Sequence, residues 1–212
     1  MRSATGEKLR QHLTERTRFF DEQVLAAVAA GIPQVVILGA GYDDRALRFR
    51  TRGVRYFEVD QHATQGDKRR RLERLGADFD ALVLLAADFR NDDTAAALAA
   101  AGHDDTKASL FICEGLLIYL EEQTNESLLA GLRARAASGS RLAASLAVHR
   151  EGEDSASVIA AANARRRHSA AEPWLTILPS GGQLALLGRA GWSVSESSNA
   201  VEGMLCVLAR PS

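Results

Sequence analysis

Short, continuous runs of apolar residues alternate with longer helical patterns along most of this chain, and this alternation restricts its fold more than any other feature. The runs predicted as strands are residues 34–38, 55–59, 82–86, 109–113, 141–148, 192–196 and 204–209. The predicted helices are residues 15–30, 61–75, 94–101, 123–137 and 180–190. Strands that are apolar throughout belong in a sheet covered on both faces, which is typical of parallel sheets. The sequence therefore predicts an α/β fold with a mostly parallel, seven-stranded sheet and helices on both faces.

The connection between the last two predicted strands differs from the others. Only the polar segment SSNAVEG, residues 197–203, joins them. A crossover between parallel strands needs a dozen or more residues, whereas an antiparallel hairpin needs only a few. We therefore expect the last strand to be antiparallel.

Length, charge and cysteine content narrow the class of protein. A chain of 212 residues is long enough for one large domain, and we predict a single domain over residues 1–212. The formal net charge of −1 gives no overall electrostatic support for binding nucleic acid or an anionic membrane, and no apolar stretch approaches a membrane span. Cys113 and Cys206 lie inside apolar runs, and we interpret them as reduced thiols of a cytoplasmic protein. No cysteine–histidine cluster predicts a metal site.

The segment Gly39-Ala40-Gly41 follows the first strand directly and predicts a loop that lets a ligand approach the backbone. A dinucleotide-binding loop has a third glycine where this chain has Asp44. Asp43 and Asp44 are expected to repel a pyrophosphate and to favour a ligand with a cationic amino group. A tight turn without any ligand is the alternative.

Three acidic residues end or follow successive predicted strands: Asp60, Asp88 and Glu114. Asp60 lies 21 residues after Gly39, close to the position where related folds hold ribose hydroxyls. The carboxyl ends of parallel strands surround the ligand crevice of an open α/β sheet. The spacing of these acids therefore predicts a nucleoside site.

Several segments of the chain together resemble the leucine carboxyl methyltransferase family. They are VVILGAGYDDRALRF, YFEVDQ, ADFRND and FICEGLLIYL, preceded by ERTRFFDEQVLAA and followed near the end by LLGRAGW. The family uses S-adenosylmethionine and includes protein phosphatase carboxyl methyltransferases and polyketide O-methyltransferases of the tetracenomycin type. The resemblance runs from about residue 15 to the end, with a gap near residues 150–175. It implies a Rossmann-like class I methyltransferase fold with strand order 3-2-1-4-5-7-6.

The resemblance also implies cofactor-binding residues at the methionine end of S-adenosylmethionine. Arg16 matches the arginine that binds the methionine carboxylate, and Gly39 and Gly41 match the loop beneath the methionine moiety. Glu114 matches the acid near the amino group and the methyl-transfer centre. These roles agree with the chemistry of the groups, since a guanidinium complements a carboxylate and a carboxylate balances an ammonium.

At the nucleoside end, Asp60 matches the ribose-binding acid and Asp88 matches the acid beside the adenine amino group. Phe89 is expected to contribute its backbone and an apolar wall. On the acceptor side, Arg90 and Tyr119 match residues that hold the substrate carboxylate in the protein-methylating branch of the family.

This sequence differs from the usual family pattern in its length and its lid, so the molecule that accepts the methyl group is the hardest property to infer. Family members are usually longer, and an N-terminal lid helix is expected to be short or absent. Residues 150–178 are predicted as a short substrate lid, and lids determine substrate choice. A carboxylate acceptor is already ionised and needs no base, whereas a hydroxyl acceptor does, and His149 is then the first candidate.

The sequence thus predicts an S-adenosylmethionine-dependent O-methyltransferase that methylates a carboxylate of a small secondary metabolite. Three alternatives stay open: a hydroxyl or phenol O-methyltransferase of natural-product biosynthesis, a nicotinamide-dependent oxidoreductase, and a non-catalytic cofactor-binding protein on a similar sheet. The expected partner is a small-molecule acceptor, with neither nucleic acid nor membrane, and a homodimer is left open.

Overall fold

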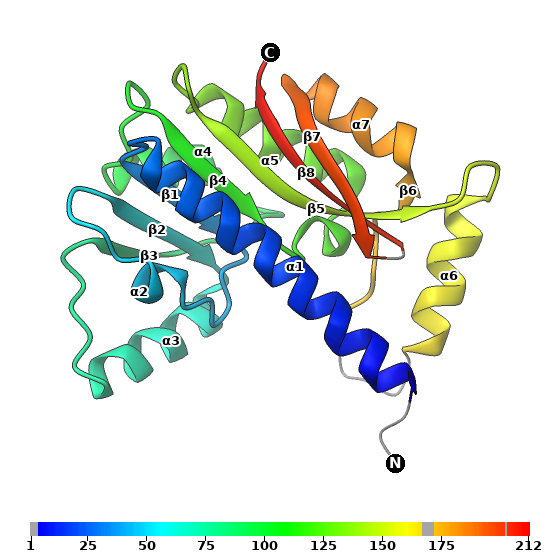
Figure 1. The fold of residues 1–212 in the computed structure, drawn as a ribbon, viewed down its shortest axis with the longest axis horizontal. Coiled ribbons are helices and arrows are strands. Elements are labelled where there is room, and N and C mark those ends of the chain that lie inside the picture. Colours follow the sequence, from blue (N-terminus) through cyan, green and yellow to red (C-terminus); the bar gives the residue numbers. More distant parts are fainter. Residues whose placement is uncertain (1–3, 167–171, 202) are drawn as a thin grey trace.

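One mixed sheet forms the centre of the computed structural model, which describes residues 4–166, 172–201 and 203–212 (Figure 1). Its strands follow the order β3-β2-β1-β4-β5-β8-β7. Their bounds are β1 (Gln34–Leu38), β2 (Arg55–Asp60), β3 (Leu82–Ala86), β4 (Ser109–Cys113), β5 (Arg141–His149), β7 (Trp192–Val201) and β8 (Met204–Pro211). A two-residue strand, β6 (Leu178–Pro179), pairs with β5 outside this path. It was not predicted, and two residues are too few to give a periodic signal.

The direction of the strands confirms the predicted topology. Strands β3, β2, β1, β4 and β5 are parallel neighbours, and β8 is antiparallel to both β5 and β7. The last strand therefore inserts between β5 and β7, as the order 3-2-1-4-5-7-6 requires. The hairpin of β7 and β8 confirms the prediction made from its short connection.

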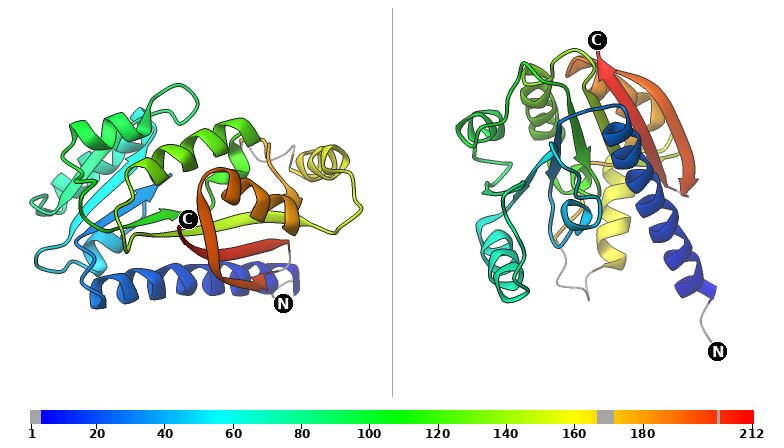
Figure 2. Two further views of the ribbon diagram at one scale, coloured as in Figure 1. Left: turned by 90° about the horizontal axis from the view of Figure 1, so that it is seen from above. Right: turned by 60° about the vertical axis from the view of Figure 1, so that its left-hand side comes forward.

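Helices cover both faces of the sheet because successive strand residues point to opposite sides (Figure 2). Val36 and Leu38 of β1 belong to the core beneath α4 (Thr94–Ala100), α5 (Glu122–Ala134) and α7 (Ser180–Arg189). Val35 and Ile37 belong to the core beneath three helices on the opposite face, α1 (Ala4–Ala29), α2 (Arg45–Arg48) and α3 (His62–Arg74). No helix in the described ranges is long and apolar enough to cross a membrane.

Four helical segments differ from the predictions. Helix α1 begins at Ala4, earlier than the predicted residue 15. Helix α2 has four residues and the 3-10 helix Leu117–Tyr119 has three, so neither is long enough for an amphipathic stripe. Helix α6 (Ser155–Arg165) lies in the predicted lid and contains no buried residue, which explains why no apolar stripe marked it. Residues 167–171 of the predicted lid lie outside the described residues.

Candidate cofactor and acceptor site

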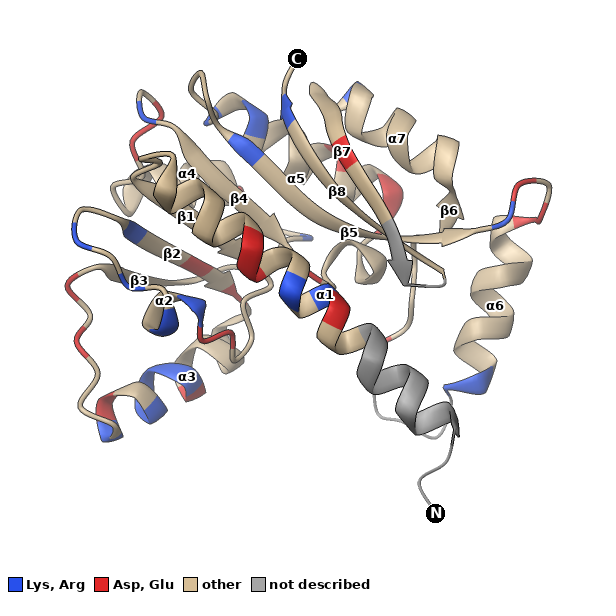
Figure 3. Cartoon of the chain, in the orientation of Figure 1, with Lys and Arg blue, Asp and Glu red and all other residues tan. Residues whose placement is uncertain are grey.

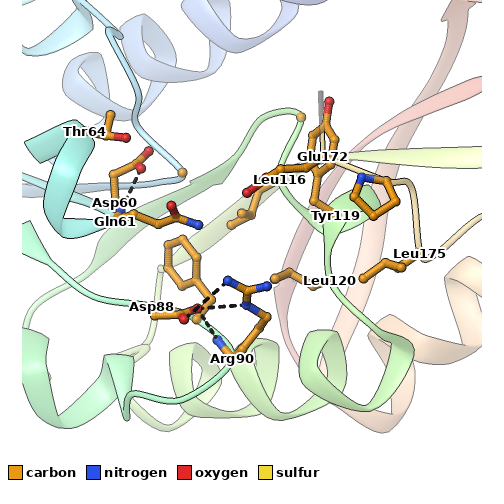
Figure 4. Close-up of a pocket in the computed structure, with 14 residues that line it drawn as sticks. Asp60, Gln61, Thr64, Asp88, Arg90, Leu116, Tyr119, Leu120, Glu172 and Leu175 are labelled. Atoms are coloured by element: carbon orange, nitrogen blue, oxygen red, sulfur yellow. Dashed lines mark hydrogen bonds and ion pairs between the residues drawn. The ribbon is translucent and has the colours of Figure 1, made fainter. Parts of the chain in front are cut away.

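Two cavities meet at Gly39, where β1 ends. The first cavity has a volume of about 380 Å³ and is lined from the ends of β2 and β3, the turn after β4 and the lid (Figure 4). The second cavity has a volume of about 260 Å³ and is lined by α1, the loop after β1 and the end of β4. Because Gly39 lines both, the two cavities are neighbours.

The glycine loop is shaped by backbone conformations that favour glycine. The φ angles are 65° at Gly39 and 48° at Gly41, in the left-handed region. A Cβ atom on Gly39 would lie 3.1 Å from Cδ1 of Leu116, whereas one on Gly41 would meet no atom within 4 Å. The loop therefore packs closely on the turn after β4 at Gly39 and faces open space at Gly41.

Asp60 fixes this loop to the end of β2. Its Oδ2 accepts a hydrogen bond from the Gly41 backbone N–H at 2.7 Å, and its Oδ1 accepts one from the Gln61 backbone N–H at 2.7 Å. Each carboxylate oxygen has a second lone pair, so Asp60 keeps capacity for further donors. Asp60 also lines the first cavity, where the sequence predicts that it binds ribose.

Asp88 and Arg90 form an ion pair in the wall of the first cavity (Figure 4). Asp88 Oδ1 accepts hydrogen bonds from the backbone N–H and the Nε of Arg90, both at 3.1 Å, and Oδ2 accepts one from Nδ2 of Asn91 at 2.8 Å. The hydrogen bond from the Arg90 side chain is the main reason why the pKa of Asp88 is lowered. The sequence assigned these two residues to opposite sides of the site, and the structure joins them. Phe89 lies between them in the chain and lines the same cavity.

The second cavity holds a partly buried cluster of opposite charges, of which Arg45 is the buried member. Oε1 of Glu114 accepts a hydrogen bond from Nε of Arg16 at 2.8 Å, and Oε2 lies 2.8 Å from Nη1 of Arg45. Arg45 also pairs with Asp43 and Asp21. Burial alone would lower the pKa of Arg45, but the carboxylates of Asp43 and Glu114 more than offset this, so its pKa is raised. Figure 3 shows charges of both signs on α1 and around α2, and the pair of Arg45 with Asp21 joins these two helices.

This cluster changes one interpretation of the glycine loop. Asp43 pairs with Arg45, and Oδ1 of Asp44 lies 2.7 Å from Nε of Arg48. Much of the negative charge expected to repel a pyrophosphate is therefore compensated within the loop and α2, and the repulsion stays a prediction. Sequence reasoning also assigned no role to Arg45. The available signal was the position of Arg45 directly after the two acids of the glycine loop.

The acceptor candidates lie in different places. Tyr119 ends the 3-10 helix Leu117–Tyr119 and lines the first cavity. The lid is joined to this 3-10 helix by a hydrogen bond from the Leu175 backbone N–H to Ile118 O at 2.7 Å. His149 lines neither cavity. Its Nδ1 and Nε2 are engaged with Arg150 O at 2.8 Å and Ser155 Oγ at 2.7 Å.

The structure therefore gathers the predicted residues into two groups and leaves one apart. Asp60, Asp88, Phe89, Arg90 and Tyr119 surround the first cavity, while Arg16 and Glu114 lie in the second. Gly39 belongs to both, and Gly41 adjoins them through its bond to Asp60. The individual roles of all these residues, and of His149, remain predictions.

The fold is that of class I methyltransferases. The magnesium protoporphyrin IX methyltransferase from Synechocystis PCC 6803, solved with bound S-adenosylhomocysteine, superposes with a TM-score of 0.61 at 16% identity, covering 100% of this chain and 89% of that chain. The PH0226 protein from Pyrococcus horikoshii OT3 gives a TM-score of 0.64 at 10% identity over 93% of this chain and 91% of that one. At such identities the likeness concerns the fold alone.

Sequence comparison gives the family. The chain belongs to the leucine carboxyl methyltransferase family, whose model matches residues 1–133. A Streptomyces avermitilis protein, provisionally named an S-adenosyl-L-methionine-dependent methyltransferase, is 40% identical over 170 residues, which cover 77% of this chain and 56% of that protein. The chain spans about half the length of the curated relatives that it matches.

Proposed function

We propose that this protein is an S-adenosylmethionine-dependent O-methyltransferase whose acceptor is a carboxylate of a small metabolite. The observation that carries the proposal is the junction of the two cavities at Gly39. Residues matching the family's nucleoside-binding positions line one cavity, and those matching its methionine-binding positions line the other. A cofactor that has a nucleoside at one end and an amino acid at the other suits this arrangement.

The residues present fit that cofactor. Arg16 and Glu114 offer a cation and an anion to an amino acid zwitterion, and Asp60 and Asp88 offer acceptors to ribose hydroxyls and an adenine amino group. The open space above Gly41 leaves room for a ligand against the loop. S-adenosylmethionine, when bound, supplies an electrophilic methyl group on a positively charged sulfur.

The first cavity also supports the choice of a carboxylate acceptor. Among the described residues that line it, Arg90 is the only cation, and its side chain is 57% exposed. The guanidinium engages Asp88 through Nε and Nη2. Its remaining N–H groups can hold one oxygen of an acceptor carboxylate together with the hydroxyl of Tyr119. The other oxygen is then free to attack, and the residues contribute by orientation and by excluding water.

A hydroxyl acceptor has weaker support. It requires a group that removes the proton, and no histidine among the described residues lines the first cavity. The predicted base, His149, is engaged with Ser155 instead.

The experiment that tests the proposal offers matched pairs of acceptors. Small carboxylic acids and the corresponding primary alcohols are incubated with the protein and S-adenosylmethionine carrying a labelled methyl group, and the products are identified by mass spectrometry. Methyl esters without methyl ethers are expected. Ethers alone would contradict the carboxylate assignment. Cofactor binding with no transfer to any acceptor would favour the non-catalytic alternative.

A further inference from the structure

Arg45 lies at the centre of the charge cluster beside the second cavity, and its side chain is only 5% exposed. All three guanidinium nitrogens have acceptors. Nε donates to Asp21 Oδ1 at 2.7 Å, Nη2 donates to the backbone oxygen of Thr17 at 3.4 Å, and Nη1 pairs with both Asp43 and Glu114. A buried arginine with this many partners has one orientation available to it.

These partners come from different parts of the fold. Asp21 and Thr17 belong to α1, Asp43 to the loop after β1, and Glu114 follows β4. The contacts with Asp21, Thr17 and Asp43 hold the Arg45 side chain in place, because they involve elements packed on the same face of the sheet. The fourth reaches Glu114, whose other oxygen is held by Arg16. Glu114 is thus held by Arg16 on one oxygen and by Arg45 on the other, and neither pairing was predicted from the sequence.

We propose that Arg45 is a positioning residue that holds the Glu114 carboxylate in place for the amino group at the methionine end of the cofactor. This inference rests on the proposed function. Glu114 without Arg45 would have one fewer charged partner, and its side chain could turn away from the cavity. A lysine keeps the charge of Arg45 but not its planar set of donors, so it cannot serve Asp21, Asp43 and Glu114 together.

The neighbouring Arg48 is a matched control. It lies on the same short helix and also pairs with Asp21, with Nη1 at 2.8 Å from Oδ2. It differs in that its side chain is 39% exposed and its other charged partner is Asp44. A loss of cofactor affinity that comes from disturbing α2 or Asp21 should appear in the variants of both arginines. A loss that acts through Glu114 should appear only in the Arg45 variant.

The test measures the affinity for S-adenosylhomocysteine by calorimetry in the wild type, Arg45→Lys and Arg48→Lys, with thermal unfolding to verify that each variant is folded. We expect Arg45→Lys to weaken binding roughly tenfold, in line with the loss of one charge-assisted interaction, and Arg48→Lys to change it less than threefold. Equal losses in the two variants would overturn the inference.

A second comparison repeats Arg45→Lys in a Glu114→Gln background. If Arg45 acts through Glu114, the loss caused by Arg45→Lys should shrink to less than threefold, because the partner that it positions no longer carries a charge. An undiminished loss would show that Arg45 has a purely structural role. Failure of the wild type to bind S-adenosylhomocysteine would instead contradict the proposed function.

Discussion

Replacement of Asp60 by alanine separates the two tasks that the structure gives to this residue. The carboxylate holds the glycine loop by accepting hydrogen bonds from the Gly41 and Gln61 backbone N–H groups, both at 2.7 Å. It also lines the first cavity, where we expect it to accept hydrogen bonds from ribose hydroxyls. Asp60→Ala removes both sets of interactions.

The size of each effect follows from these contacts. Two hydrogen bonds to a charged group at a half-buried position contribute together about 2 kcal/mol to the free energy of unfolding, after allowance for solvent. For a chain of this length, such a loss lowers Tm by about 4–8 °C. The lost ribose bonds should weaken S-adenosylhomocysteine binding by roughly tenfold to a hundredfold in addition.

Calorimetry and thermal unfolding of the same preparations measure the two effects. Glu73→Ala serves as the control, since Glu73 is an exposed acid on α3 and its removal changes the net charge equally. It should leave both quantities unchanged. A lower Tm with unchanged affinity in Asp60→Ala would refute the ribose assignment and leave Asp60 as an anchor of the loop.

Three further predictions concern other residues. Arg90→Ala should lower kcat/KM by about tenfold to a thousandfold and leave the affinity for S-adenosylhomocysteine nearly unchanged; a large loss of affinity would mean that Arg90 belongs to the cofactor side. Burial lowers the pKa of His103 to about 4, so protons favour the unfolded chain and stability is lost as pH falls from about 6.5 towards 4. Urea unfolding at pH 7 and at pH 4.5 measures how much the free energy of unfolding falls between these pH values. This fall should be larger by about 2 kcal/mol in the wild type than in His103→Gln, and equal falls would contradict the prediction. Trp192→Phe should cost roughly 1–3 kcal/mol in urea unfolding at pH 7, because the hydrogen bond from Nε1 to Leu129 O at 2.9 Å is lost, and a cost near zero would mean that the bond adds nothing.

The strands were predictable because burial of the sheet on both faces demands continuous apolar runs. The short and exposed elements were not predictable from the sequence. Helix α2 and the 3-10 helix Leu117–Tyr119 are held by tertiary contacts rather than by a periodic pattern. The hydrogen bonds that fasten the lid, such as that from Leu175 to Ile118, join backbone groups 57 positions apart and have no signature in the side chains.

The sequence predicted where the residues of the candidate site lie in the fold, but not which of them form ion pairs. Strand ends place Asp60, Asp88 and Glu114 along one edge of the sheet, and this follows from topology. Which cation meets which acid depends on side-chain directions across separate elements. For this reason the pairing of Arg45 with Glu114 came only from the structure, as did the separation of His149 from both cavities.

The most direct test of the central claim is a calorimetric titration of the wild-type protein with S-adenosylhomocysteine, run beside a titration with NADH. The arrangement of the two cavities around Gly39 predicts saturable binding of one S-adenosylhomocysteine per chain and no binding of NADH. Absence of S-adenosylhomocysteine binding, or saturable binding of NADH in its place, would contradict the account and favour an oxidoreductase on the same kind of sheet.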